Sequence, residues 1–314
     1  MQIENCLILA AGFGTRMGVI GQELPKVLWP VFEKSLLELQ VNYARSLGIK
    51  NIYINLHYMG DKIEAFCKER EAFREVVFLW EKPEILDIGG AVHNLAAKIK
   101  YQGRLLVLNA DQFFYFSQDA FLKTIENYKQ HPVILFNYWV NSSEGYNALE
   151  VDNKRMVTGL IKNKDLTPDS RIETYTGISL IDLGQLEKIS GQSPFFESVA
   201  PWHKKAVAAV LLETDYWDFG TVKRYWESCY RILKTYRANS NHPFLRFLVQ
   251  ERALKTWKIN LQNESYHALS RQVINLAPDQ LTTAAAPMIV LTKSSINAQK
   301  SGIWWNTLFE EIKS

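Results

Sequence analysis

The feature that most limits the fold of this chain is the alternation of strand and helix patterns over about its first 140 residues. Short apolar runs typical of buried strands occur at residues 6–11, 51–56, 76–80, 104–110 and 132–140. Apolar residues at helical spacing lie between them, at residues 36–48, 61–70 and 91–100. This order predicts crossover connections and a mainly parallel sheet covered by helices on both faces. Ligands bind such sheets beyond the carboxyl ends of the strands.

Several residues mark where the helices begin and end. Ser35 and Glu38 form the pattern of a capping box, and Gly48 is placed to end the same helix. We expect Asp61 to cap the next helix, and Gly89 and Gly90 to precede the helix at 91–100.

The pattern changes after about Glu144. Shorter strand-like runs at 147–151, 156–161, 174–181 and 206–213 predict an inserted, partly antiparallel layer, and residues 221–237 predict one long amphipathic helix. We expect a domain boundary at 239–242, which gives a catalytic domain at 1–238 and a C-terminal extension at 239–314. The apolar run at 303–305 indicates burial against this chain or a second copy, which would make a homo-oligomer.

Composition excludes several classes of protein. Hydrophobic residues make up 47% of the 314 residues and the net charge is only +3, so the chain is expected to fold without a nucleic-acid or membrane-binding surface. The apolar run at 7–11 is too short for a signal peptide or a membrane span. Three distant cysteines favour neither a disulfide framework nor a zinc site, so we expect a cytoplasmic protein.

The turn after the first strand is the first candidate binding site. Residues 7–18, LILAAGFGTRMG, lack the third glycine of the dinucleotide fingerprint and the lysine of the P-loop. Glycines let successive backbone N–H groups approach an anion, and the guanidinium of Arg16 matches phosphate oxygens. Lys26 follows the rigid Pro25 and could be directed at the same phosphates. An ordinary turn with two solvated cations is the alternative.

Two aspartates follow strand-like runs. Asp111 ends VLNAD, and Asp218 precedes a Gly-Thr pair that leads into the long helix. Carboxylates beside bound phosphates usually hold Mg²⁺ with few protein ligands. The alternative for Asp111 is a cap of the following turn. Together with Arg16 and Lys26, both aspartates suit metal-assisted nucleotidyl transfer.

These motifs, in this order, resemble the sugar-1-phosphate nucleotidyltransferases. The resemblance rests on LAAGFGTRM with PKVLWPV, the LNAD strand end, TYTGISL and WDFGT, and covers roughly residues 3–230. It implies a Rossmann-like, three-layer α/β fold with a mixed, mainly parallel sheet. It also implies the reaction of an NTP with a sugar 1-phosphate to give an NDP-sugar and pyrophosphate.

The resemblance assigns roles to individual residues. Arg16, Lys26, Asp111 and Asp218 would be catalytic, with both aspartates as ligands of Mg²⁺. The nucleotide would contact Leu9, Ala10, Ala11, Gly12, Gly14, Thr15, Arg16, Lys26, Asp87, Gly89, Gly90 and Asn109. The sugar side would involve Glu150, Lys162, Glu173, Thr176 and Gly177. An exposed structural acid is the alternative for Glu150, and a solvated loop is the alternative for Lys162.

The acidic Asp87 before Ile88-Gly-Gly is similar to the branch that contains N-acetylmuramate-1-phosphate uridylyltransferase. UTP with N-acetylmuramate 1-phosphate, for the cell wall, is therefore the favoured pair, and GTP with mannose 1-phosphate comes next. Two alternatives stay open. One is a cytidylyltransferase that acts on a non-sugar phosphate such as phosphocholine, and the other is a non-catalytic nucleotide sensor.

Overall fold

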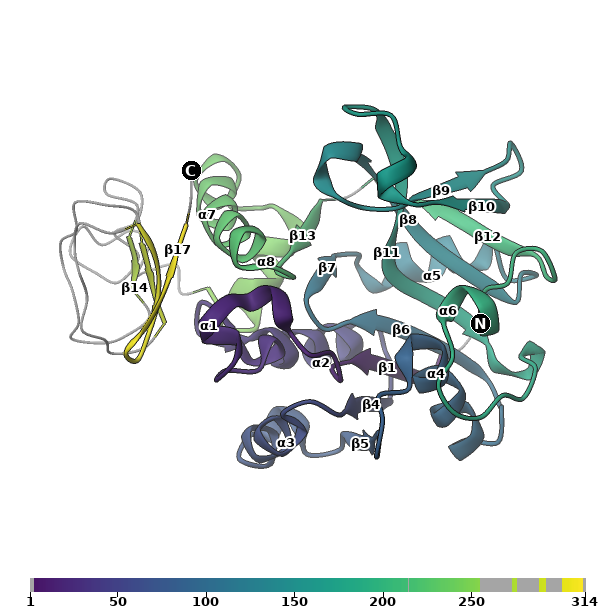
Figure 1. Ribbon diagram of the computed structural model, residues 1–314, viewed down its shortest axis with the longest axis horizontal. Helices are drawn as coiled ribbons and strands as arrows, with labels where there is room; N and C mark the ends of the chain where they lie inside the picture. The colour runs from purple at the N-terminus through teal and green to yellow at the C-terminus, as the bar shows by residue number, and fades with distance from the viewer. Residues whose placement is uncertain (1–2, 214, 255–272, 276–287, 292–300, 313–314) are drawn as a thin grey trace. The chain divides into compact units, whose positions relative to one another are not determined.

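The structure, a computed structural model, describes residues 3–213, 215–254, 273–275, 288–291 and 301–312 (Figure 1). The chain divides into two compact units. One contains Met1–Gly12 and Gln40–Tyr216, and the other contains Phe13–Leu39 and Trp217–Ser314. The division falls within helix α2 (Leu36–Ser46) and strand β13 (Tyr216–Asp218). The expected domains at 1–238 and 239–314 stay a prediction, and residues 255–272, 276–287 and 292–300 of the extension lie outside the described residues.

A seven-stranded sheet in the order β12-β8-β11-β6-β1-β4-β5 forms the centre of the first unit. Strand β11 runs antiparallel to both of its neighbours, whereas the other pairs are parallel. This confirms the mixed, mainly parallel sheet expected from the sequence. The strands are β1 (Asn5–Leu9), β4 (Asn51–Leu56), β5 (Val77–Trp80), β6 (Arg104–Asn109), β8 (Val133–Asn141), β11 (Arg171–Asp182) and β12 (Val207–Leu211).

The inserted layer expected after Glu144 is wrong for two of its strands. Strands β11 and β12 belong to the central sheet, because β11 pairs with β6 and β8 while β12 pairs with β8. Only β9 (Ala148–Val151) and β10 (Val157–Ile161) form a separate antiparallel hairpin. The shorter runs after Glu144 suggested a separate layer, but the length of a strand does not decide which sheet it joins. A strand can pair with any neighbour whose backbone groups lack hydrogen-bond partners.

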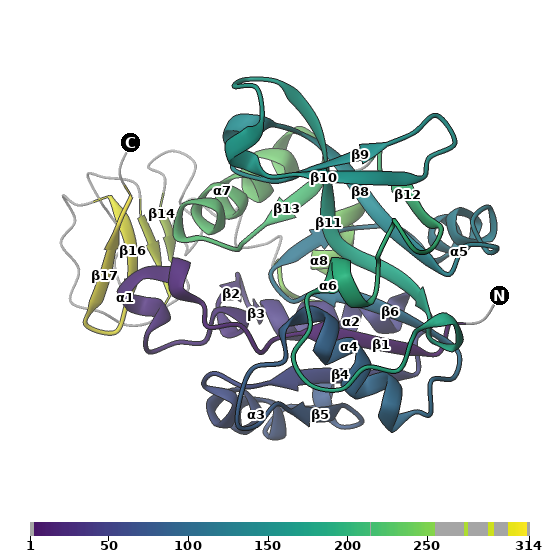
Figure 2. The same ribbon diagram turned by 45° about the vertical axis from the view of Figure 1, so that its right-hand side comes forward.

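Helices cover both faces of this sheet (Figures 1 and 2). On one face, α4 (Asp87–Lys98) and α6 (Phe195–Ser198) pack in a core with Leu7, Val107 and Leu135. On the other face, Phe121 of α5 (Gln118–Glu126) stacks on Phe136 at 6.1 Å between ring centroids. The two faces alternate along each strand, so Leu135 and Phe136 belong to opposite layers.

Local signals predicted some helix ends and missed others. The Ser35 hydroxyl accepts a hydrogen bond from the Glu38 N–H at 3.1 Å, as a capping residue should. Asp61 does not cap α3 (Gly60–Lys68), since Met59 precedes the helix in a left-handed conformation without a side-chain cap. Helix α4 begins at Asp87, so Gly89 and Gly90 lie inside it.

The second unit contains the rest of the glycine loop, from Phe13 on, and the long amphipathic helix. Helix α7 (Val222–Ala238) is capped by the Thr221 hydroxyl, and α8 (Pro243–Gln250) follows. The C-terminal strands form a four-stranded sheet in the order β14-β15-β16-β17. The short elements of this unit are η1 (Thr15–Met17), α1 (Gly18–Gly21), η2 (Lys26–Leu28), β2 (Pro30–Val31), β3 (Lys34–Ser35), β14 (Val273–Asn275), β15 (Met288–Val290), β16 (Gly302–Trp305) and β17 (Leu308–Glu311).

Close packing of α4 predicts a stability effect. A Cβ atom on Gly89 would lie 2.3 Å from the Ser198 hydroxyl oxygen and 2.5 Å from the Ser193 carbonyl oxygen. Gly89→Ala should lower the free energy of unfolding by about 2 kcal/mol, because overpacking displaces the neighbouring backbone. Gly12→Ala is the control, since no atom lies within 4 Å of its added Cβ. Urea unfolding with equal losses for both variants would contradict this packing.

Candidate functional site

The carboxyl ends of β1, β4 and β6 lie at one edge of the central sheet. The register pairs Leu9 of β1 with Asn55 of β4 and with Asn109 of β6. The residues that follow these strands therefore emerge together, which is the edge where open α/β sheets bind ligands. Leu9, Ala10, Ala11, Gly12, Asn109 and Asp111 all lie at or just beyond these strand ends.

Hydrogen bonds tie the start of the glycine loop to the loop before α4. The Ala10 N–H donates to Asn55 Oδ1 at 2.7 Å, and Asn55 Nδ2 donates to Glu81 Oε1 at 2.7 Å. The other carboxylate oxygen of Glu81 accepts from the Leu86 N–H at 2.8 Å. Glu81 is 1% exposed and Asn55 is 5% exposed, so both polar groups depend on these partners.

Amide side chains hold the strand end that carries Asp111. Gln40 Nε2 donates to the carbonyl oxygens of Asn109, at 2.9 Å, and of Gln112, at 2.6 Å. Asn109 Nδ2 donates to Gln112 Oε1 at 2.8 Å. Asp111 is 7% exposed, and its backbone is held in place because the residues on either side of it are anchored.

The start of α4 contains three of the expected nucleotide contacts. Asp87 is exposed, has a φ of +60°, and accepts a hydrogen bond from the Ile88 N–H at 2.6 Å. Gly89 and Gly90 are buried, and the Gly90 N–H donates to the Ser193 carbonyl at 3.1 Å. Packing accounts for both glycines, whereas Asp87 is the member of this set that is open to solvent.

The rest of the glycine loop belongs to the second unit. Thr15 and Arg16 are exposed in the short helix η1, and Lys26 is half-buried at the start of η2. A Cβ atom added to Gly14 would lie 3.6 Å from the Cβ of Lys26, so these two predicted residues are neighbours. The sequence separates them by a loop, and this unit brings them together.

Asp218 is held by donors of its own segment. Its carboxylate accepts from the Gly220 N–H at 2.6 Å and from Arg224 Nη1 at 2.9 Å. Asp218 is 6% exposed, so this ion pair is largely shielded from water. The Ser228 hydroxyl also donates to the Asp218 main-chain carbonyl at 2.6 Å, which fixes the backbone against α7.

Both aspartates supply the carboxylate oxygens that Mg²⁺ prefers. Asp111 is a carboxylate at a strand end, and Mg²⁺ typically uses one or two such ligands. Each carboxylate oxygen of Asp218 already accepts one hydrogen bond, so a cation bound there would share these oxygens with the Gly220 N–H or with Arg224. Within the described ranges no three His, Cys, Asp or Glu side chains gather as a metal-binding group. The assignment of both aspartates as metal ligands stays a prediction.

Three expected sugar-binding residues lie on β11. Glu173 is 6% exposed and accepts hydrogen bonds from Arg155 and from Asn137 Nδ2, the latter at 2.9 Å. The Thr176 hydroxyl donates to the Phe136 carbonyl at 2.7 Å, within the irregular part of the strand. Gly177 has a φ of +80°, and a Cβ atom there would lie 1.9 Å from Asn109 Nδ2. The structure thus brings Gly177 to the strand end that carries Asn109.

Glu150 and Lys162 lie on the hairpin and just after it. Glu150 is exposed, and its carboxylate lies over Gly159 of the facing strand, where an added Cβ would be 2.0 Å from it. Lys162 is exposed as well, and it precedes a short helical turn without forming a side-chain cap.

Polar residues that hold these sites but were not predicted from the sequence include Asn55, Glu81, Arg155 and Arg224. Asn55 and Glu81 carried a signal, since each is a polar residue at the carboxyl end of an apolar strand-like run. Arg155 and Arg224 carried none, because a turn arginine and a helix arginine are ordinary surface residues until the fold supplies a carboxylate.

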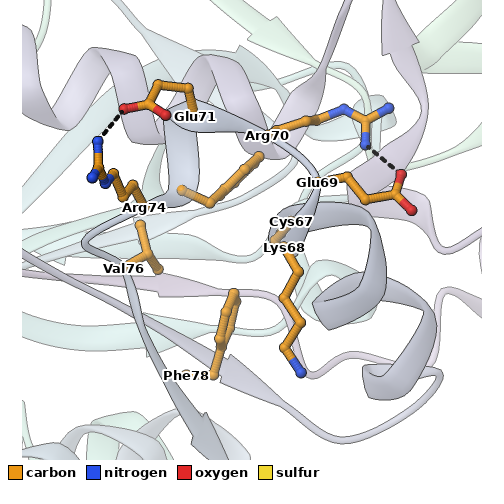
Figure 3. Close-up of a pocket in the computed structure, with 9 residues that line it drawn as sticks. Cys67, Lys68, Glu69, Arg70, Glu71, Arg74, Val76 and Phe78 are labelled. Carbon is orange, nitrogen blue, oxygen red and sulfur yellow. Dashed lines mark hydrogen bonds and ion pairs between the residues drawn. The ribbon is translucent and has the colours of Figure 1, made fainter.

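A separate cavity of about 430 Å³ lies at the opposite end of β5, between α3 and the start of that strand (Figure 3). Two ion pairs lie in its lining, Arg70 with Glu69 at 3.8 Å and Arg74 with Glu71 at 3.3 Å. Cys67 also lines it and is buried, as are Cys6 and Cys229, and none of these three cysteines is in a disulfide. Burial raises the pKa of the Cys229 thiol to about 12.

The Arg155–Glu173 pair predicts a second stability effect. Arg155→Met leaves a buried carboxylate without its cation, and the free energy of unfolding should fall by about 3 kcal/mol. Arg171→Met is the control, since Arg171 lies over the exposed Trp139 ring at 4.8 Å and should cost less than about 1 kcal/mol. Chemical denaturation would measure both, and a smaller loss for Arg155 than for Arg171 would contradict the structural role.

Comparison with known proteins identifies the family and the fold of this chain. A family model described as "Nucleotidyl transferase" matches residues 5–235. Two crystal structures share the fold. HddC from Yersinia pseudotuberculosis complexed with GMP-PN has a TM-score of 0.62 and 21% identity over 73% of this chain and 99% of its own. A UDP-glucose pyrophosphorylase complexed with UDP-glucose has a TM-score of 0.59 and 17% identity over 74% and 100%.

Three curated relatives are similar in sequence. A bifunctional sugar-1-phosphate nucleotidylyltransferase/acetyltransferase from Sulfurisphaera tokodaii is 28% identical over 58% of this chain and 45% of its own length. A D-glycero-alpha-D-manno-heptose 1-phosphate guanylyltransferase from Campylobacter jejuni is 26% identical over 71% of this chain and 97% of its own. An N-acetylmuramate alpha-1-phosphate uridylyltransferase from Caulobacter vibrioides is 30% identical over 34% and 46%. The chain therefore spans less than half of two of these relatives.

Proposed function

Because this chain belongs to the nucleotidyl transferase family, we propose that it transfers a nucleoside monophosphate from an NTP to a sugar 1-phosphate, with Mg²⁺. The match to the family model confirms the family that the sequence predicted. The observation that supports the proposal is the in-register row of Leu9, Asn55 and Asn109, because residues 10–12 and Asp111 follow these strands at one edge of the sheet.

The nucleotide donor is proposed to bind at this edge. Backbone N–H groups after Ala10 would hold the base and phosphates, since they leave the strand ladder at this point and can approach an anion. Arg16 and Lys26 would pair with phosphate oxygens, as a planar fork and a point charge respectively. Asp111 would hold Mg²⁺, which when bound supplies positive charge to the phosphate oxygens.

The reaction needs no nucleophile from the protein. A phosphate oxygen of the sugar 1-phosphate attacks the α-phosphorus of the NTP in line, a new P–O bond forms, and the bond to the β-phosphate breaks. Pyrophosphate leaves with the bonding electron pair. The chain's own contribution is to orient the two phosphates and to stabilise charge on their oxygens.

The sugar and base follow from similarity and stay proposals. UTP with N-acetylmuramate 1-phosphate is our first pair, on the acidic Asp87 before Ile88-Gly-Gly. GTP with a mannose- or heptose-type 1-phosphate is the second, because the matched guanylyltransferase is covered over 97% of its length. In the part of the chain that the structure describes, every helix is too short or too polar to cross a bilayer. A cytoplasmic location and a homo-oligomer formed through residues 239–314 stay predictions.

Pyrophosphate release tests this function. The NTPs are crossed with a panel of sugar 1-phosphates, with and without Mg²⁺, and one UTP or GTP pair should give clear turnover. Asp111→Asn should lower kcat at least about a hundredfold, because an amide is a poor ligand for Mg²⁺. Activity only with CTP and phosphocholine would support the cytidylyltransferase alternative. Nucleotide binding without turnover on any pair would support the sensor.

A further inference from the structure

The hydrogen-bonded chain from Ala10 to Leu86 connects two segments that are far apart in sequence. Asn55 accepts from the Ala10 N–H and donates to Glu81, and Glu81 accepts from the Leu86 N–H, each at 2.7 or 2.8 Å. A further contact of 2.9 Å joins His57 Nδ1 to the Glu81 carbonyl oxygen. Three strand ends, of β1, β4 and β5, are thus tied through two side chains.

Because Asn55 and Glu81 are buried, their hydrogen bonds restrict where the bonded backbone amides can lie. At 1% exposure the Glu81 carboxylate cannot exchange its partners for water, and leaving one partner unmade would cost the full desolvation penalty of the group. Asn55, at 5% exposure, is under the same restriction. The separation between the Ala10 and Leu86 amides is therefore set by two rigid planar groups.

The two segments joined by these hydrogen bonds are the segments that we expect to contact the nucleotide. Ala10 begins the glycine loop, and Leu86 directly precedes Asp87, the exposed first residue of α4 with a φ of +60°. A left-handed aspartate is uncommon and persists only where its surroundings hold it. The Leu86 anchor lies one residue away from it.

We propose that Asn55 and Glu81 are positioning residues for the NTP, which set the spacing between the two backbone segments that contact the base. This inference rests on the proposed function. Neither side chain needs to touch the nucleotide, because each acts through the backbone amide that it holds.

A complementary exchange tests the inference. Glu81→Gln sets an amide NH₂ against the NH₂ of Asn55, and Asn55→Asp sets a carboxylate against Glu81, so each single variant breaks the chain of donors and acceptors. In the double variant, the amide that replaces Glu81 would donate to the carboxylate that replaces Asn55. That carboxylate would still accept from the Ala10 N–H, and the Leu86 N–H would donate to the oxygen of the new amide. The pattern is then complete again, with the same number of bonds and the same net charge.

Nucleotide affinity and melting temperature together separate an effect on nucleotide positioning from an effect on folding. We expect Glu81→Gln, which loses one buried hydrogen bond, to raise the KM for the NTP and the dissociation constant of a non-hydrolysable NTP about tenfold. Asn55→Asp sets two buried carboxylates against each other and should raise both constants at least as much. For each variant kcat should stay within about twofold. The double variant should return both constants to within about threefold of wild type. Melting temperatures establish that each variant is folded.

Asn51→Asp provides a matched control. Asn51 Nδ2 donates to Asn5 Oδ1 at 3.1 Å, a hydrogen bond between side-chain amides at the amino ends of β1 and β4. Its loss should leave nucleotide affinity unchanged. Wild-type affinity in both single variants, or a folded double variant without recovery, would overturn the inference alone. Absence of nucleotide binding by the wild-type chain would overturn the proposed function as well.

Discussion

The parallel register of β6, β1 and β4 is the constraint on which the rest of the candidate site depends. The pairing of β1 with β4 and with β6 ends in one row, at Leu9, Asn55 and Asn109, so backbone groups that follow β1 need other partners. Side chains supply two such partners. Asn55 Oδ1 accepts from the Ala10 N–H, and Gln40 Nε2 donates to the Asn109 carbonyl oxygen. The same interruption that requires these side chains also opens backbone N–H groups to a ligand.

Much of this fold could be predicted from apolar periodicity. The runs that became β1 and β6 are short and largely apolar, as strands buried on both faces are. The place of β11 in the sheet could not be predicted, because its pairing with β6 and β8 depends on contacts far apart in sequence. The cap assigned to Asp61 was wrong, since Met59 enters α3 directly in a left-handed conformation.

Sequence identifies chemical groups but not their partners. Glu173 and Asp218 carry the carboxylates that the motifs suggested, yet the fold gives them Arg155 and Arg224 as counterions. A buried carboxylate paired in this way is a strong local constraint, because removing either partner leaves an uncompensated charge. Asp87 shows the opposite case, in which an acidic residue at an expected site is exposed.

The nucleotide is proposed to bind at one edge of the sheet, between the end of β1 and the start of α4. Amide hydrogen exchange, measured with and without a non-hydrolysable NTP, tests this location. Bound nucleotide should slow exchange in two separate segments, 9–12 and 85–90. Protection confined to other segments, with these two unchanged, would contradict it.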